Sequence, residues 1–282
     1  MTLTPPIFLT TASLSQLGLS QHRIAGLVSA GRLIRLRRGM YAHAGTEPLL
    51  LEVGRLGGRL DCVSLLQHLG VFVRESSPLH MQLDPGTTRL PRRPQGVVAH
   101  WRPRTVPREA LTVDLISALV QAGRCQRPRD TIATLDNALH RSLIDEDDLA
   151  EIFRRLPRRR RVLRTLLDAR CESGPETIMR LLLRAIGCSF DLQVQIDGVG
   201  RVDFVVDGWL IIECDSRAHH EGWEQQKNDR RRDLAAARLG YTTVRPLAED
   251  ILYGADELRS ALAEIIRHPP TKPSQRNSTD SA

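Results

Sequence analysis

Besides Asp207, which lies beside Gly208, three acidic residues interrupt the apolar stretch "RVDFVVDGWLIIECD" at residues 201–215 of the chain: Asp203, Glu213 and Asp215. Burying an unpaired carboxylate is costly, so an apolar strand seldom carries one without a partner or a ligand. Asp207 and Gly208 separate two runs of β-forming residues, and this dipeptide is a typical hairpin signal. The stretch therefore predicts a β-hairpin with acids on both strands.

The register of this hairpin decides whether the acids face one another. A two-residue turn would point Asp203 and Glu213 to opposite faces of the sheet. A three-residue loop pairs Val206 with Leu210, and only this register leaves one face fully apolar. Because a one-residue slip exchanges the two faces, the amphipathic pattern selects the longer loop. We therefore expect Asp203 directly opposite Glu213.

Two like charges in this position need a compensating partner. Directly paired residues have Cβ atoms about 4.5–5.5 Å apart, and like charges at that distance are destabilising. A cation between the acids, or protonation of one of them, relieves the repulsion. Two carboxylates so placed suit a hard divalent ion, so we expect Mg²⁺ or Mn²⁺ at Asp203 and Glu213. The alternative is a structural network in which Arg201 and nearby arginines neutralise the acids.

Further polar groups surround this pair in the sequence. His219 and His220 follow in the next loop, and either can donate to a phosphate or position a water. Glu176 completes the motif Ser173-x-x-Glu176, which is either a capping box or a source of one more site acid, and both readings stay open. The candidate catalytic residues are Glu176, Asp203, Glu213, Asp215 and His219.

Regular elements around the acids predict an α/β domain over residues 167–268. A helix "SGPETIMRLLLRAIG" begins after Ser173 as its N-cap and stops at Gly187. Three strands follow ("FDLQVQI", "RVDFVV" and "WLIIECD"), then a polar helix over about 224–239, a strand "YTTVRPL" and one last helix, "AEDILYGADELRSALAEIIRH". The tail at 269–282, rich in Pro and Ser, is expected to be disordered.

Residues 1–46 contain arginines but neither Asp nor Glu. Their pattern predicts a short helix ending at Gly18, a helix with Ser20 as N-cap, and a basic hairpin that turns near Arg38-Gly39. This is the order of a winged helix-turn-helix, in which the second helix reads base edges and the wing meets phosphate. The expected DNA contacts are Ser20, Gln21, His22 and Arg23 in the helix, and Arg35, Arg37 and Arg38 in the wing. The alternative is a helical interaction domain with solvated arginines.

Residues 47–166 predict an α+β connecting domain, to which the sequence assigns no chemistry. His68, His80 and His100 are isolated from one another, which is typical of structural histidines. The five cysteines lie far apart without a CxxC pair. This spacing argues against a zinc ribbon or a disulfide framework and fits a reducing cytoplasm.

Composition adds bounds on partners and location. The formal net charge of +7 and pI of about 9.7 favour polyanionic partners, although the strong preference for Arg over Lys can also reflect genome composition. No apolar run approaches the roughly 18 residues of a membrane span, and the N-terminus lacks the basic region of a signal peptide. We therefore expect a cytoplasmic chain with no membrane partner. The aromatic content of 4% disfavours an RNA-processing role that depends on base stacking.

The sequence also resembles two known families. The pattern "G.L.RL.RG.Y", carried by residues 31–41, is similar to the N-terminal domain of AbiEi-type antitoxins. The segments "ESGPETIMRLLLRAIG", "RVDFVVDGWLIIECDSRAHH" and "NDRRRDLAAARLGYTTVRPL" resemble the very-short-patch-repair-like domain of the PD-(D/E)XK nuclease superfamily. Residues 47–166 are similar to the connecting region of bacterial proteins that join an AbiEi-like head to a nuclease-like tail.

The second resemblance assigns roles to the acids. It implies that Asp203 is the superfamily's metal-binding Asp, that Glu213 is the acid of its E-x-K element, and that Glu176 is its first-helix acid. Asp215 and His219 match an E-x-D…H variant of the motif. Asp215 thus replaces the usual lysine, and the resemblance leaves His219 or Lys227 to supply a cation. Asp229, Arg232 and Asp233 match the helix that follows.

Together these patterns predict a multidomain α/β protein that acts as a metal-dependent DNA endonuclease in phage defence or DNA repair. Its N-terminal domain would target it to DNA. The alternative is an antitoxin-like transcriptional regulator whose nuclease-like domain is inactive, because the lysine is missing. DNA is the expected partner. A homodimer fits, since dimers are common among DNA readers, and a cognate toxin is not identified by the sequence.

Overall fold

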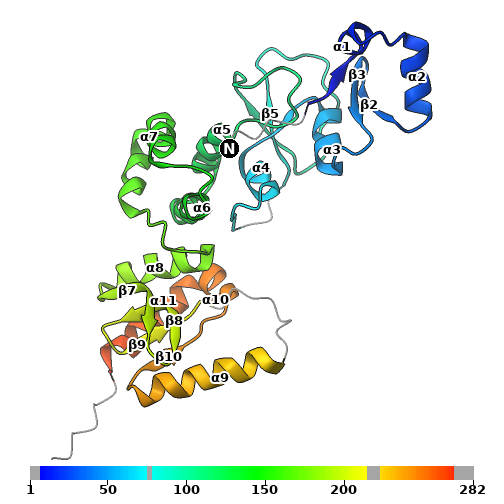
Figure 1. The fold of residues 1–282 in the computed structure, drawn as a ribbon. Helices are drawn as coiled ribbons and strands as arrows, with labels where there is room; N and C mark the ends of the chain where they lie inside the picture. The colour runs from blue at the N-terminus through cyan, green and yellow to red at the C-terminus, as the bar shows by residue number, and fades with distance from the viewer. Residues whose placement is uncertain (1–6, 75–77, 215–222, 270–282) are drawn as a thin grey trace, which may run out of the picture. The chain divides into compact units, whose positions relative to one another are not determined.

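The computed structural model describes residues 7–74, 78–214 and 223–269, with the backbone alone for 223–225. The chain divides into two compact units, residues 1–167 (unit 1) and 168–282 (unit 2). Each unit combines helices with small sheets, as expected for a multidomain α/β protein (Figure 1). No helix in the described ranges is both long and apolar enough to cross a membrane.

Unit 1 begins with the predicted helix, helix and hairpin: α1 (Thr11–Gln16), α2 (Gln21–Ser29), β2 (Leu33–Arg37) and β3 (Met40–His43). Ser20 caps α2 as expected, because its Oγ accepts a hydrogen bond from the Arg23 amide at 3.3 Å. A two-residue strand, β1 (Leu9–Thr10), pairs with β3 and completes a sheet of order β1-β3-β2. The sequence did not predict β1, which is too short to show a period.

The rest of unit 1 follows the predicted α+β pattern. A second sheet, of order β4-β5-β6, contains β4 (Arg59–Leu60), β5 (His80–Leu83) and β6 (Val98–Trp101), and β5 and β6 run parallel. The helices are α3 (Pro48–Leu56), α4 (Cys62–His68), α5 (Leu115–Cys125), α6 (Pro128–His140) and α7 (Glu146–Arg155). The helix α7 ends before Pro157, and a 3-10 helix, η1 (Arg158–Leu166), begins after it.

Unit 2 contains α8 (Gly174–Ile186), β7 (Phe190–Ile196), β8 (Gly200–Val206), β9 (Leu210–Ile212), α9 (Trp223–Arg238), β10 (Thr242–Val244), α10 (Ala248–Tyr253) and α11 (Ala255–Arg267). The element order up to β10 is confirmed. The prediction of one last helix was wrong, because Gly254 ends α10 and starts α11. A glycine inside a helix costs about 1 kcal/mol relative to Ala, so the chain breaks there readily.

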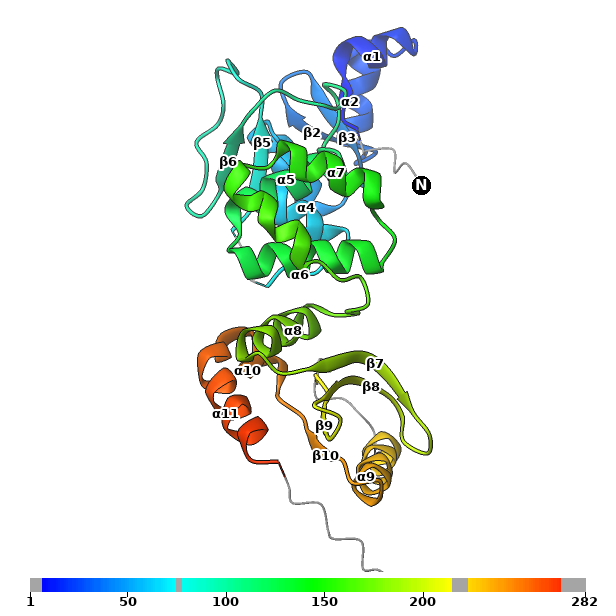
Figure 2. The same ribbon diagram turned by 90° about the vertical axis from the view of Figure 1, so that its left-hand side faces the viewer.

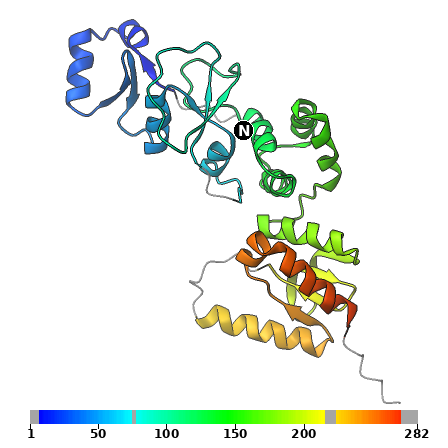
Figure 3. The same ribbon diagram turned by 180° about the vertical axis from the view of Figure 1, so that it is seen from behind.

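The sheet of unit 2 has the order β10-β9-β8-β7, with β10 parallel to β9 and the other pairs antiparallel. Helices α8, α10 and α11 lie on one side of this sheet and α9 on the other, as Figures 2 and 3 show. Ala236 of α9 packs in one apolar cluster with Val205 and Ile211. The α9 side is therefore the face on which the predicted register places Asp203 and Glu213.

Candidate functional site

The β8–β9 hairpin adopts the register that places the acids together. Its paired residues are Phe204 with Ile212, Val205 with Ile211 and Val206 with Leu210, which confirms the three-residue loop. Asp207 and Gly208 in this loop have positive φ values of 47° and 73°. Continued one step beyond the end of β9, the register sets Asp203 opposite Glu213.

Asp203 lies in a half-buried position where backbone and side-chain donors meet it. Its Oδ2 accepts a hydrogen bond from the Cys214 amide at 2.8 Å, and the polar side chain of Gln193, on the neighbouring strand, also lowers the pKa of the Asp203 carboxyl. Burial raises the pKa of the Asp203 carboxyl above its ordinary value, more than these donors lower it. Gln193 has a φ of 53°, a conformation uncommon for a residue with a side chain and often found at functional sites.

Glu176 is only 5% exposed, near the start of α8. Its Oε2 accepts hydrogen bonds from the Glu172 amide at 2.8 Å and from Gln193 Nε2 at 2.9 Å. Burial raises the pKa of Glu176, and the nearby charge of Asp203 raises it further. Glu176 thus reaches back past Ser173 rather than forming the reciprocal capping box, although Ser173 does cap α8. The structure brings Glu176 and Asp203 together around Gln193.

Glu213 is held between two arginines. Its Oε1 lies 2.7 Å from Nη2 of Arg232, on α9, and its Oε2 lies 2.8 Å from Nη2 of Arg245, directly after β10. Burial raises the pKa of Glu213, against the opposing effect of the two guanidinium groups. Under the alternative interpretation, Arg201 and nearby arginines neutralise the acids; Arg201 itself pairs with Glu172 at 2.7 Å, whereas Arg232 and Arg245 pair with Glu213.

The arginine pairs bear directly on metal binding. Carboxylate and amide oxygens are the ligands that Mg²⁺ and Mn²⁺ prefer. Oε1 of Gln193 is buried and accepts no hydrogen bond from the described residues, so a bound ion or its water would satisfy it. No described Arg or Lys forms an ion pair with Glu176 or Asp203. The residues therefore fit a divalent ion at Glu176, Asp203 and Gln193, whereas Glu213 joins only if it leaves its arginines.

Two candidate catalytic residues, Asp215 and His219, lie outside the described residues, as do Ser216 and His220. Lys227, the proposed stand-in for the missing lysine, is half-buried on α9. Arg232 and Arg245 are the cations that pair with Glu213. Arg232 was noted only through the family resemblance, and Arg245 was missed. Its sequence signal is a charged residue directly after the short strand "TTV", which consists of β-branched residues.

Three of the predicted DNA contacts line a hollow in unit 1. Ser20, Gln21, His22 and Arg23 are all exposed at the start of α2. A hollow of about 550 Å³ between α2 and the hairpin is lined by Gln21, Arg35 and Arg38 among others. This places two wing arginines and the helix start around one depression.

Arg37 does not share this position. Its Nη2 donates to the Arg89 carbonyl at 3.1 Å, and its guanidinium lies over Gly57, where an added Cβ would come within 2.0 Å of Nη1. Gly57 has a φ of 83° and ends α3, so Arg37 packs against the turn that follows that helix. We therefore assign Arg37 to the packing of unit 1 rather than to phosphate contact.

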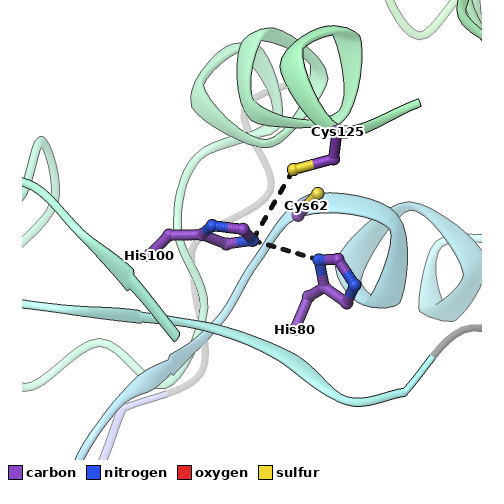
Figure 4. Close-up of side chains that lie close together, drawn as sticks. All are labelled: Cys62, His80, His100 and Cys125. Carbon is purple, nitrogen blue, oxygen red and sulfur yellow. Dashed lines mark hydrogen bonds between the residues drawn. The ribbon is translucent and has the colours of Figure 1, made fainter. Parts of the chain in front are cut away.

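A second polar cluster was missed by the sequence. Cys62, His80, His100 and Cys125 come from α4, β5, β6 and α5 and point toward one another (Figure 4). One ligand atom from each lies within 4.8 Å of the others, and in the described part of the chain no other such group of three or more His, Cys, Asp or Glu residues occurs. Both histidines had been interpreted as isolated. Their spacing in sequence gives no signal, because each ligand comes from a different element.

Comparisons with known proteins assign neither a family nor a function to this chain. No family model matches the sequence, and no curated protein matches it. Among solved structures, the chain is similar to the RV2827C protein from Mycobacterium tuberculosis, with 17% identity and a TM-score of 0.32 over 89% of this chain and 90% of that one. A similarity at this level supports no statement about function, which has to be argued from the sites.

Proposed function

We propose that this chain is a DNA-binding protein whose unit 2 hydrolyses phosphodiester bonds with Mg²⁺ or Mn²⁺. The observation that carries the proposal is the β8–β9 register, which sets Asp203 and Glu213 on one face. Glu176 supports it as a third acid, since its pKa is raised by burial and by the charge of Asp203. Raised carboxyl pKa values in a cluster are typical of functional sites, because folding alone gives no reason to keep such a group.

The residues divide the work in a definite way. Glu176, Asp203 and Gln193 would hold the ion, which would supply a water of lowered pKa and neutralise charge on the scissile phosphate. Arg232 and Arg245 would bind a phosphate of the DNA backbone, since guanidinium groups pair well with phosphate oxygens. A phosphate that pairs with one of these arginines would free Glu213 to bind the ion. DNA binding would thereby complete the set of metal ligands.

Unit 1 would bind the DNA. The exposed start of α2 and the hollow lined by Arg35 and Arg38 support a protein–DNA contact of the helix-and-wing kind. The absence of Asp and Glu from residues 1–46 strengthens the local positive potential.

Plasmid cleavage tests the proposal. Purified full-length protein is incubated with supercoiled plasmid and Mg²⁺ or Mn²⁺, beside Glu213→Ala and the matched surface variant Glu264→Ala. We expect wild type and Glu264→Ala to convert the plasmid, and Glu213→Ala to lose at least about 100-fold in rate, the scale of removing one electrostatic group from a site. Equal rates in all three proteins would contradict the proposal.

A second function is favoured by one observation. Both carboxylate oxygens of Glu213 are paired with arginines, which is how a purely structural acid is held. On this reading the chain is a DNA-binding regulator and unit 2 does not cut. The same assay distinguishes the two, because tight binding to DNA without cleavage under either metal supports the regulator.

Metal binding can be measured separately. Titration calorimetry of Mn²⁺ into wild type and Asp203→Ala is expected to give binding heat only in wild type. Equal heats would place the ion elsewhere and remove the basis for hydrolysis at these acids.

A further inference from the structure

The Cys62, His80, His100 and Cys125 cluster lies in unit 1, in a different unit from the acids. Nδ1 of His80 is 3.0 Å from Nε2 of His100, and the same His100 atom is 4.0 Å from Sγ of Cys125. Sγ of Cys62 lies within 4.8 Å of Sγ of Cys125 and of a ring nitrogen of each histidine. Two imidazole nitrogens and two sulfurs thus converge on one small volume (Figure 4).

These distances are close to those of a tetrahedral metal site and need only small adjustments to match it. Zn–S bonds of about 2.3 Å and Zn–N bonds of about 2.0–2.1 Å set neighbouring ligand atoms about 3.3–3.8 Å apart. The distances of 3.0 Å and 4.0 Å lie on either side of this range, and every pair lies within 4.8 Å. Rotations of side-chain torsions by small amounts suffice to bring the four atoms to equal distances from one centre.

The backbone fixes the positions of two of the ligands, Cys62 and His80. Cys62 is fully buried and has a φ of 54°, an uncommon conformation for a non-glycine residue. His80 is 7% exposed, and its amide donates to Oγ of Ser64 at 2.8 Å, which fixes the start of β5. The parallel pairing of β5 with β6 sets His100 two residues along from the position opposite His80.

The carboxylate of Asp61 lies next to two of these ligands, Cys62 and His100. Asp61 is fully buried, and its Oδ1 accepts the Cys62 amide at 2.7 Å and Nη2 of Arg102 at 2.6 Å. Asp61 also interacts electrostatically with His100, and its Oδ2 has no hydrogen-bond partner among the described residues. Metal-binding histidines commonly have such a carboxylate near the ring nitrogen that does not bind the metal, where it fixes the orientation of the ring.

We propose that Cys62, His80, His100 and Cys125 bind one zinc ion. Among the common cellular divalent ions, zinc is the one that prefers a donor set of two thiolates and two imidazoles. Mg²⁺ prefers oxygen donors. Because the protein supplies all four ligands, no position stays open for substrate, and the ion is structural. It joins α4, β5, β6 and α5, and so holds the ends of the long connection over residues 84–97.

An entry path is present. Cys125 is exposed, and a pocket of about 220 Å³ lined by His80, Cys125 and Arg127 among others opens beside the cluster. Exposure of Cys125 also makes it the best residue to replace, since the removal of an exposed thiol leaves the core of unit 1 intact.

The test uses untagged full-length protein, reduced under nitrogen and loaded with Zn²⁺ or Co²⁺. We expect one zinc per chain by elemental analysis. With Co²⁺, we expect visible d–d bands of tetrahedral intensity and a near-ultraviolet thiolate-to-cobalt band. Cys125→Ser and His100→Asn should weaken the affinity by at least about 100-fold, as competition with a chromophoric chelator measures. The matched controls Cys188→Ser and His43→Asn should bind as wild type does.

Other outcomes overturn the proposal. Absence of the thiolate-to-cobalt band in reduced protein shows that the cysteines bind no metal. Equal affinity in Cys125→Ser and wild type places the metal elsewhere. A Cys62–Cys125 disulfide that forms quantitatively in zinc-loaded protein, detected by mass spectrometry, identifies a redox pair instead. Circular dichroism of each variant separates loss of a ligand from loss of the fold.

Discussion

Oε1 of Glu213 lies 2.7 Å from Nη2 of Arg232, and the same guanidinium nitrogen also donates to the Arg201 carbonyl at 2.7 Å. Nε of Arg232 donates in turn to the Val199 carbonyl at 3.0 Å. Arg232 is therefore fixed to the backbone of β8 and its preceding turn, and it presents a preset positive charge to Glu213. Arg245 meets the other oxygen and also pairs with Asp233 at 2.8 Å, which ties β10 to α9.

Replacing Arg245 should separate metal binding from DNA binding. Arg245→Gln removes one of the two cations that compete for Glu213, so Mn²⁺ affinity without DNA should rise by about 10-fold, equivalent to about 1.4 kcal/mol. Affinity for DNA should fall, because a partner for phosphate has been removed. Arg245→Lys keeps the charge and is expected to resemble wild type in Mn²⁺ affinity. Calorimetry measures the metal, and unchanged affinity in Arg245→Gln would show that Glu213 does not take part.

Neutralising Glu176 should stabilise unit 2 at neutral pH. Burial, and then the charge of Asp203, raise the folded-state pKa of Glu176. The folded state therefore holds this proton more tightly than the unfolded chain does, and stability falls as pH rises through the folded pKa. Glu176→Gln should raise Tm by a few degrees at pH 7, where about 1 kcal/mol corresponds to about 4–8 °C.

This gain should shrink as pH falls below the unfolded pKa of about 4.3, where both forms are neutral. Glu264→Gln, at an exposed position of α11, serves as the control and should change Tm little at any pH. A lower Tm for Glu176→Gln at pH 7 would mean that its hydrogen bonds with the Glu172 amide and Gln193 outweigh the burial of its charge.

The wing arginines should differ in their effect on DNA affinity. Arg35 and Arg38 line the hollow beside α2, so replacing either with Ala should lower the magnitude of the salt slope of DNA binding by about 0.9 for each phosphate that is no longer neutralised. Arg37→Ala should leave the slope unchanged and lower the Tm of unit 1, since Arg37 packs on Gly57. Arg55→Ala, an exposed arginine of α3, is the control. Fluorescence anisotropy over a series of salt concentrations measures the slopes.

Removal of zinc from protein loaded with zinc alone, without Mg²⁺ or Mn²⁺, should act on unit 1 only. If zinc binds the Cys62 cluster, a chelator lowers the Tm of unit 1 but not of unit 2, and calorimetry of the full chain should show one shifted transition. An ion at 100 times its Kd stabilises by about 2.7 kcal/mol. Cys125→Ser should lack this shift, whereas Cys188→Ser should retain it. A chelator that moves both transitions equally would argue against a site confined to unit 1.

Local patterns in the sequence were sufficient to predict many of the elements and one register. Alternating apolar residues and the Asp207-Gly208 signal predicted the β8–β9 hairpin and its three-residue loop. This was possible because side chains of a strand alternate between the two faces of the sheet, so that each register places a different set of residues on the apolar face. Capping residues likewise predicted the starts of α2 and α8 at Ser20 and Ser173. The last helix was predicted as one because its apolar period continues across Gly254.

Contacts between distant segments could not be predicted in the same way. The arginines around Glu213 come from α9 and from the end of β10, and no local rule connects them to β9. The position of Arg37 on Gly57 also depends on the meeting of the hairpin with α3. The cysteine and histidine cluster is the clearest case, because its four residues share neither spacing nor periodicity. In each of these cases, tertiary packing sets which side chains meet.

The wide sequence separation of the cluster has a consequence for the order of folding. In a short finger, metal and chain fold together, because close ligands meet at little entropic cost. Cys62 and Cys125 enclose most of the central part of unit 1, so their meeting closes a long loop and requires the β4-β5-β6 sheet and α5 first. Zinc would therefore bind late, to an almost complete fold. It would slow the unfolding rate of unit 1 and leave the folding rate unchanged, as interactions absent from the transition state do.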